Sequence, residues 1–148
     1  AVIFVALPLL IGERSAEKVK IEVGSALTEL DEGPEDYEIR GRDLMTGIPK
    51  TIKISYSEVA FALDKSVSKL EEAVLKALET SPPELSADIY ERGIYLTGGG
   101  ALLRGLDKRL ALKTKLPIHV AEDPLKAVVR GTGAALKNIE KFRAVLMT

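Results

Sequence analysis

The feature that most constrains the fold is a long amphipathic segment over residues 56–79. Its apolar residues recur at spacings of four, four, three, four and four, the period of one face of an α-helix. They are Val59, Leu63, Val67, Leu70, Val74 and Leu78. Ser55 and Glu58 form a capping box, in which the hydroxyl accepts from a helix amide and the carboxylate reaches back. The chain is therefore expected to fold around one long helix with a single apolar face.

Three further elements are expected before this helix. Residues 12–23 predict a short amphipathic helix that ends at Gly24. Residues 37–42 and 48–55 alternate apolar with polar side chains, which is typical of half-buried strands. The turn-forming link at residues 44–47 predicts that the two strands form a hairpin.

After the long helix the pattern changes. A second capping box, Ser81-Pro82-Pro83-Glu84, predicts a short helix that has a proline at its first position and ends near Gly93. Then strands and helices alternate with short links, which implies parallel strands joined by a right-handed crossover. The expected order is strand 94–97, Gly98-Gly99-Gly100, helix 101–113, strand 117–121 and helix 125–137.

This order divides the chain into parts of different class. We expect a mixed α+β lobe at 12–92 and a βαβα half-domain of α/β type at 93–138. An atypical apolar segment, 1–11, precedes them, and a tail, 139–148, follows them. Residues 1–11 carry no charge, but they are too few to cross a bilayer and lack the basic start of a signal peptide.

Composition excludes several functions. Lysine and arginine number 21 against 22 acidic residues, so the surplus of positive charge needed to bind nucleic acid electrostatically is missing. The sequence has no cysteine, which rules out disulfides, thiolate zinc sites and a cysteine nucleophile. The single histidine, His119, lies on a strand expected to be buried, and we interpret it as a core or edge residue rather than a catalytic one.

Two local patterns could bind a ligand. The three glycines, Gly98 to Gly100, lie between a strand and a helix, where the backbone can approach a phosphate, a ribose or a purine edge. Glu17 and Lys20 share one helix face and could reach one small ligand together. Each pattern also has an ordinary explanation: a tight turn without a ligand, and a solvated helix face with local ion pairs.

Taken together, several ordered motifs closely resemble MreB, the family of bacterial actin homologues that determine rod shape. The resemblance runs from about residue 9 to residue 138. The motifs are Leu9-Leu10-Ile11-Gly12-Glu13-Arg14-Ser15-Ala16-Glu17-Lys18-Val19-Lys20, Arg40-Gly41-Arg42-Asp43-Leu44, Thr46-Gly47-Ile48-Pro49-Lys50, Arg92-Gly93-Ile94-Tyr95-Leu96-Thr97-Gly98-Gly99-Gly100-Ala101-Leu102-Leu103 and Ala121-Glu122-Asp123-Pro124-Leu125.

The resemblance implies a fragment of an actin-like ATPase fold of the ribonuclease-H-like type. Residues 12–92 would correspond to subdomain IIB and residues 93–138 to part of subdomain IIA. Glu17 and Lys20 match helix positions that face adenine and ribose, and Gly98, Gly99, Gly100 and Ala101 match the adenosine loop opposite. The implied cofactor is ATP, with magnesium in the complete family.

The resemblance also implies partners and a location. The complete family forms filaments at the cytoplasmic face of the inner membrane and works with cell-wall synthesis and membrane proteins, not with nucleic acid. The family's phosphate-binding turns and the carboxylates that organise magnesium are not found in this sequence. We therefore expect no catalytic residue, no metal site and no ATPase activity for this chain alone. We also expect it to be unable to propagate a filament.

Two alternatives remain open. The chain is either part of an ATP-binding cytoskeletal protein or a non-catalytic interaction module that keeps the fold without binding nucleotide. The apolar residues 1–7 carry a separate hypothesis. They are β-prone, so we expect them to pair with the strand at 94–97. They would then cover the open sheet edge that a truncation leaves beside this strand.

Overall fold

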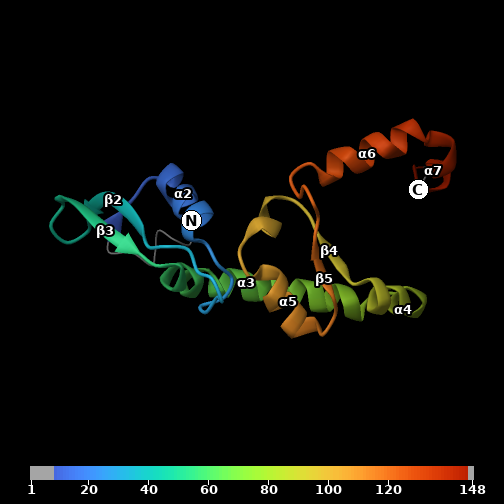
Figure 1. Cartoon of the computed structure of the whole chain (residues 1–148), viewed down its shortest axis with the longest axis horizontal. Helices are drawn as coiled ribbons and strands as arrows, with labels where there is room; N and C mark the ends of the chain where they lie inside the picture. The colour runs from blue at the N-terminus through green and yellow to red at the C-terminus, as the bar shows by residue number, and fades with distance from the viewer. Residues whose placement is uncertain (1–8, 147–148) are drawn as a thin grey trace.

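The computed structural model describes residues 9–146, and its elongated arrangement is shown in Figure 1. At one end, a three-stranded antiparallel sheet in the order β1-β2-β3 packs against helix α2. Its strands are β1 (Leu9–Leu10), β2 (Tyr37–Asp43) and β3 (Pro49–Ile54), and α2 spans Glu13–Val23. The predicted hairpin and first helix are confirmed. The short strand β1, which pairs with the end of β2, had not been predicted.

Helix α3 (Tyr56–Glu79) has the predicted bounds and runs along much of the molecule (Figure 1). Its capping box is formed: the Ser55 hydroxyl accepts from the amide of Glu58, and the Glu58 carboxylate accepts from the amide of Ser55 at 2.8 Å. Val59 and Val67 are buried, but Leu70 is 52% exposed. The periodic face therefore packs into the interior at some of its positions only.

Two apolar clusters share this helix. The first joins α2 and the antiparallel sheet to the start of α3, and Leu9, Val19, Val23 and Val59 are its most deeply buried members. The second lies between α3 and helix α5 (Leu106–Thr114) and contains Ala26, Val67, Leu106 and Leu110. Because α3 contributes to both clusters, it connects the two ends of the molecule.

The second half follows the predicted order. Helix α4 (Pro83–Arg92) leads to β4 (Ile94–Leu96), which pairs in parallel with β5 (Ile118–Val120). The crossover between them contains a 3₁₀ turn, η1 (Gly99–Leu102), and α5. Beyond β5, helix α6 (Ala127–Lys137) packs against α7 (Ile139–Leu146) and extends away from the body (Figure 1).

The second predicted capping box is wrong. Ser81 is not the N-cap of α4, because the helix begins one residue later, with Pro82 at the cap and Pro83 at the first position. The Ser81 hydroxyl instead donates to the carbonyl of Ala77 at 2.8 Å, at the end of the preceding helix. The short link between the two helices places Ser81 within reach of that carbonyl, which lies in the last turn of α3 and also accepts from the Thr80 hydroxyl at 3.2 Å.

The predicted helix 101–113 is also wrong at its start. Residues up to Leu102 form the 3₁₀ turn, Leu103 is extended, and Gly105 has φ +72° in the left-handed region, so α5 begins only at Leu106. His119 is exposed rather than buried, and its ring lies 5.0 Å from that of Tyr95 on the neighbouring strand. The β4–β5 sheet has only two strands in the described part of the chain, so it does not enclose this histidine. The hypothesis of a strand at residues 1–7 lies outside the described residues.

Candidate functional site

Glu17 and Lys20 lie on the exposed side of α2. The buried face of this helix carries Ala16, Val19 and Val23, so the residues between them turn outward. Lys20 Nζ and Glu17 Oε1 are 2.7 Å apart, and their side chains are 45% and 58% exposed. The two side chains therefore pair with each other, and an ion pair this exposed is weak enough to open for a ligand.

The glycine-rich turn lies opposite α2. Gly98 has φ +79° and donates from its amide to the carbonyl of Pro124 at 2.7 Å, which fixes the turn to the segment after β5. Gly99 and Gly100 begin η1, where a helix leaves its first amides without an internal partner. A Cβ built on Gly100 would meet no atom within 4 Å, so this backbone borders open space.

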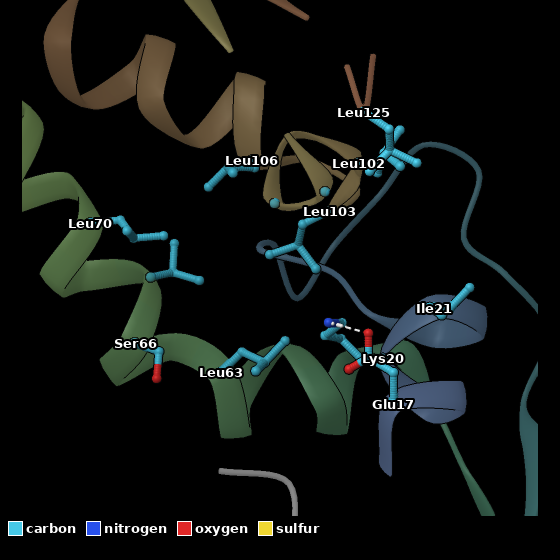
Figure 2. Close-up of a pocket in the computed structure, with 13 residues that line it drawn as sticks. Glu17, Lys20, Ile21, Leu63, Ser66, Leu70, Leu102, Leu103, Leu106 and Leu125 are labelled. Carbon is cyan, nitrogen blue, oxygen red and sulfur yellow. Dashed lines mark hydrogen bonds and ion pairs between the residues drawn. The ribbon is translucent and has the colours of Figure 1, made fainter. Parts of the chain in front are cut away.

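The structure brings these two patterns to one cavity of about 400 Å³, shown in Figure 2. Glu17 and Lys20 line one side, and Gly99 and Gly100 line another, although the two segments are about eighty positions apart in the sequence. Gly98 and Ala101 do not line it. Ala101 is 7% exposed, and its amide donates to the Gly98 carbonyl, so these two residues shape the turn behind the cavity wall.

Most of the remaining lining is apolar, and the sequence did not predict it. α3 supplies one side, and residues from α2, η1, α5 and the loop before α6 supply the others. The partly exposed Leu70 belongs to this lining, which explains why one position of the periodic α3 face is open. The apolar lining residues are Ile21, Leu63, Val67, Leu70, Leu102, Leu103, Leu106 and Leu125.

A charged network fixes α5 to α3 beside the cavity. The Arg109 guanidinium contacts Glu71, Asp64 and Ser68 on α3 and the carbonyl of Ala26 in the loop after α2. The pKa of Arg109 is raised above its ordinary value, mainly by the hydrogen bond to Glu71 and also by the hydrogen bond to Asp64. No sequence pattern pairs these residues, because they approach only when α5 packs on α3.

The described residues offer neither a metal site nor a membrane span. Among residues 9–146, no three side chains of histidine, cysteine, aspartate or glutamate lie together as metal ligands would. Over the same range, no helix has both the length and the apolar character needed to cross a bilayer.

Known structures define the class of this fold. The crystal structure of MreB5 of Spiroplasma citri bound to ADP superposes with a TM-score of 0.84 and 39% identity, covering 94% of this chain and 42% of that one. A non-polymerising MamK mutant bound to AMPPNP matches with a TM-score of 0.60 over 80% of this chain and 35% of that one. At 19% identity, the second match shows the fold alone. The fold is that of the actin-like proteins.

Sequence comparison then gives the family. The family model described as "MreB/Mbl protein" matches residues 3–144, and the chain belongs to this family. It is 50% identical over 134 residues to the cell shape-determining protein Mbl of Bacillus subtilis, and 47% identical over 131 residues to the cell shape-determining protein MreB of Escherichia coli K12. The resemblance found in the sequence is confirmed.

The match covers most of this chain and a smaller part of its relatives. It includes 90% of the chain for Mbl and 88% for MreB. The chain spans only 40% and 37% of the length of these curated relatives.

Proposed function

We propose that this chain contributes the adenosine-binding side of an ATP site in an actin-like protein that determines cell shape. In this proposal Glu17 and Lys20 contact the nucleoside from α2, and Gly99 and Gly100 approach it from the opposite turn. Gly98 and Ala101 hold that turn in shape. Nucleotide-bound relatives of the same fold support the assignment, since MreB5 has been solved with ADP and with AMPPNP.

The observation that carries the proposal is the shared cavity. Two segments about eighty positions apart, each able to bind a ligand, line one space of about 400 Å³ (Figure 2). The cavity combines a leucine-rich interior with polar groups at one side, and such a lining suits a flat, amphipathic nucleoside better than a free phosphate.

The chemistry follows from the groups present. The Glu17 carboxylate can accept hydrogen bonds from ribose hydroxyls, and the Lys20 ammonium can donate to a ring nitrogen or a hydroxyl. The amides of Gly99 and Gly100 can donate into the cavity, since neither residue carries a side chain of its own; a Cβ on Gly100 would meet no atom within 4 Å, and one on Gly99 would meet only Leu125 Cδ2, at 3.5 Å. Leucine side chains such as Leu103 and Leu106 would pack against the faces of the purine.

The wider function is proposed from the family. Residues 12–92 would serve as subdomain IIB and residues 93–138 as part of subdomain IIA, and the second apolar cluster, which combines Ala26 and Val67 with Leu106 and Leu110, would hold the two parts together. The complete protein would hydrolyse ATP, form filaments at the cytoplasmic face of the membrane and act with cell-wall synthesis and membrane proteins. We place the surface used for filament contacts in the IIB lobe.

Titration of the ¹⁵N-labelled chain with adenosine tests the site. We expect saturable shifts of the Glu17, Lys20, Gly99 and Gly100 amides with weak affinity, because no phosphate contacts contribute. Glu17→Gln and Lys20→Met should each weaken binding about fivefold to tenfold, the loss of one charge-assisted hydrogen bond. Lys18→Met is the matched control, since Lys18 lies on the same helix but not in the cavity lining.

The alternative is an interaction module with this fold that binds no nucleotide. The mutual ion pair of Glu17 and Lys20 favours it, because both groups are already satisfied without a ligand. Adenosine at millimolar concentration that shifts none of the cavity amides would support this alternative and contradict the proposed site.

A further inference from the structure

Arg104 contacts both walls of the cavity. Its main chain lies beside the loop that leaves α2: the amide of Ala26 donates to the Arg104 carbonyl at 2.8 Å, and Ser25 and Arg104 form an isolated parallel bridge. Ser25 is fully buried, and its hydroxyl also approaches the Arg104 carbonyl, at 3.4 Å. The segment after η1 is therefore paired with the segment after α2.

The Arg104 side chain reaches back to α2 itself. Its Nη1 donates to the carbonyl of Ile21 at 3.1 Å and, at a longer 3.5 Å, to that of Gly24. The last carbonyls of a helix lack internal partners and carry partial negative charge, so a cation there stabilises the helix end. Ile21 also lines the cavity, one residue after Lys20.

The two segments also approach each other at Gly24. A Cβ built on Gly24 would lie 3.2 Å from Leu103 Cδ1, a tight contact across the two segments, and 2.1 Å from the carbonyl oxygen of Lys20 in the last turn of α2 itself. Gly24 therefore leaves no room for a side chain between the end of α2 and Leu103, the residue before Arg104.

We propose that Arg104 is a positioning residue that sets the separation of the α2 wall and the glycine-turn wall of the cavity. This inference rests on the proposed nucleoside site for its functional meaning, but the geometry it asserts exists without a ligand. Arg104 does not line the cavity. It acts on the α2 wall through its hydrogen bond to Ile21, and on the glycine-turn wall through the residues that precede Arg104 in the chain.

Spin-label distances test the geometry without a ligand. The sequence has no cysteine, so Lys18→Cys on α2 and Lys113→Cys on α5 give two unique labelling sites outside the cavity lining. We expect a narrow distance distribution in the otherwise unchanged chain and a broader or shifted one in Arg104→Met. Arg104→Lys keeps the charge at the helix end and should restore the narrow distribution.

A control variant tests whether the effect comes from the position of Arg104 or from the loss of any positive charge near α2. Arg14→Met removes the same charge from the other end of α2, at a residue that does not line the cavity, and should leave the distances unchanged. Circular dichroism and urea unfolding establish that each variant folds. Arg104→Gln, which keeps hydrogen-bond donors, replaces Arg104→Met if the latter does not fold. An unchanged distribution in the folded neutral variant would overturn the inference.

Adenosine titration of the same variants connects the geometry to function. We expect about tenfold weaker binding in Arg104→Met and affinity within about threefold of the unchanged chain in Arg104→Lys. If Arg104 serves only stability, Arg104→Met should be less stable but bind adenosine with unchanged affinity once folded. That result would contradict the inference. Absence of binding in the unchanged chain would contradict the proposed function instead, while the spin-label distances would still decide the role of Arg104.

Discussion

Arg109 Nε of α5 donates to Glu71 Oε1 of α3 at 2.7 Å, and the two side chains are 17% and 10% exposed. The same guanidinium donates to the Ala26 carbonyl at 2.9 Å and approaches Asp64 on α3 at 2.9 Å. One side chain thus joins α3, α5 and the loop after α2, three elements that surround the second apolar cluster. It keeps the α5 side of the cavity fixed relative to α3.

We predict that Arg109→Met destabilises the fold by about 3 kcal/mol, because it leaves Glu71 as an uncompensated, largely buried charge. Urea unfolding followed by circular dichroism measures the loss. Arg109→Met combined with Glu71→Leu should recover much of it, since two apolar groups can replace a buried ion pair at little cost. Lys108→Met, which removes an exposed pair with Asp31, is the control and should change stability little. Equal losses in the double and single variants would contradict the prediction.

The capping box of α3 predicts a dependence on pH. The Ser55 amide and then its hydroxyl hold the pKa of Glu58 below its ordinary value near 4.5. A lowered pKa contributes stability that is full above that ordinary value and is lost as the pH falls through the folded value. The unfolding free energy should therefore decline less steeply below about pH 4.5 in Glu58→Gln than in the unchanged chain. Parallel pH curves would refute this role of Glu58.

Gly98 and Gly100 should respond differently to substitution. Gly98 has φ +79° and ψ 176°, a backbone region open in practice only to glycine, so Gly98→Ala should cost about 1–3 kcal/mol. Gly100 has no positive φ and has room for a Cβ, so Gly100→Ala should change stability by less than about 1 kcal/mol. Thermal unfolding of both variants provides the comparison. A Gly98→Ala variant as stable as Gly100→Ala would be inconsistent with a strained turn.

ATP hydrolysis by this chain alone should not exceed the buffer blank. Phosphoryl transfer requires groups that clamp the γ-phosphate and its metal, and the described residues bring together no metal-ligand cluster. Phosphate release with ATP and magnesium measures the rate. Turnover that disappears in Glu17→Ala or Gly99→Val would show that the chain hydrolyses ATP at this site, contrary to the prediction.

Helices and strands whose bounds depend on residues close together in the sequence could be predicted. The bounds of α3 follow from its apolar spacing and from Ser55 and Glu58, and the hairpin follows from the alternation on each side of Gly47. The candidate site was predictable only as two separate patterns, Glu17 with Lys20 and the glycine turn. The resemblance to one family related them to each other, and the structure places them around one cavity.

By itself the sequence determined the family, the long helix, the hairpin and the order of the second half. Spacing and capping act within a few residues, so they are visible in a linear pattern. Only the tertiary structure decided that α5 begins at Leu106, that Leu70 faces a cavity, and that Arg104 and Arg109 join distant elements. These features depend on packing and hydrogen bonds between segments up to about eighty positions apart, and no local preference specifies such contacts.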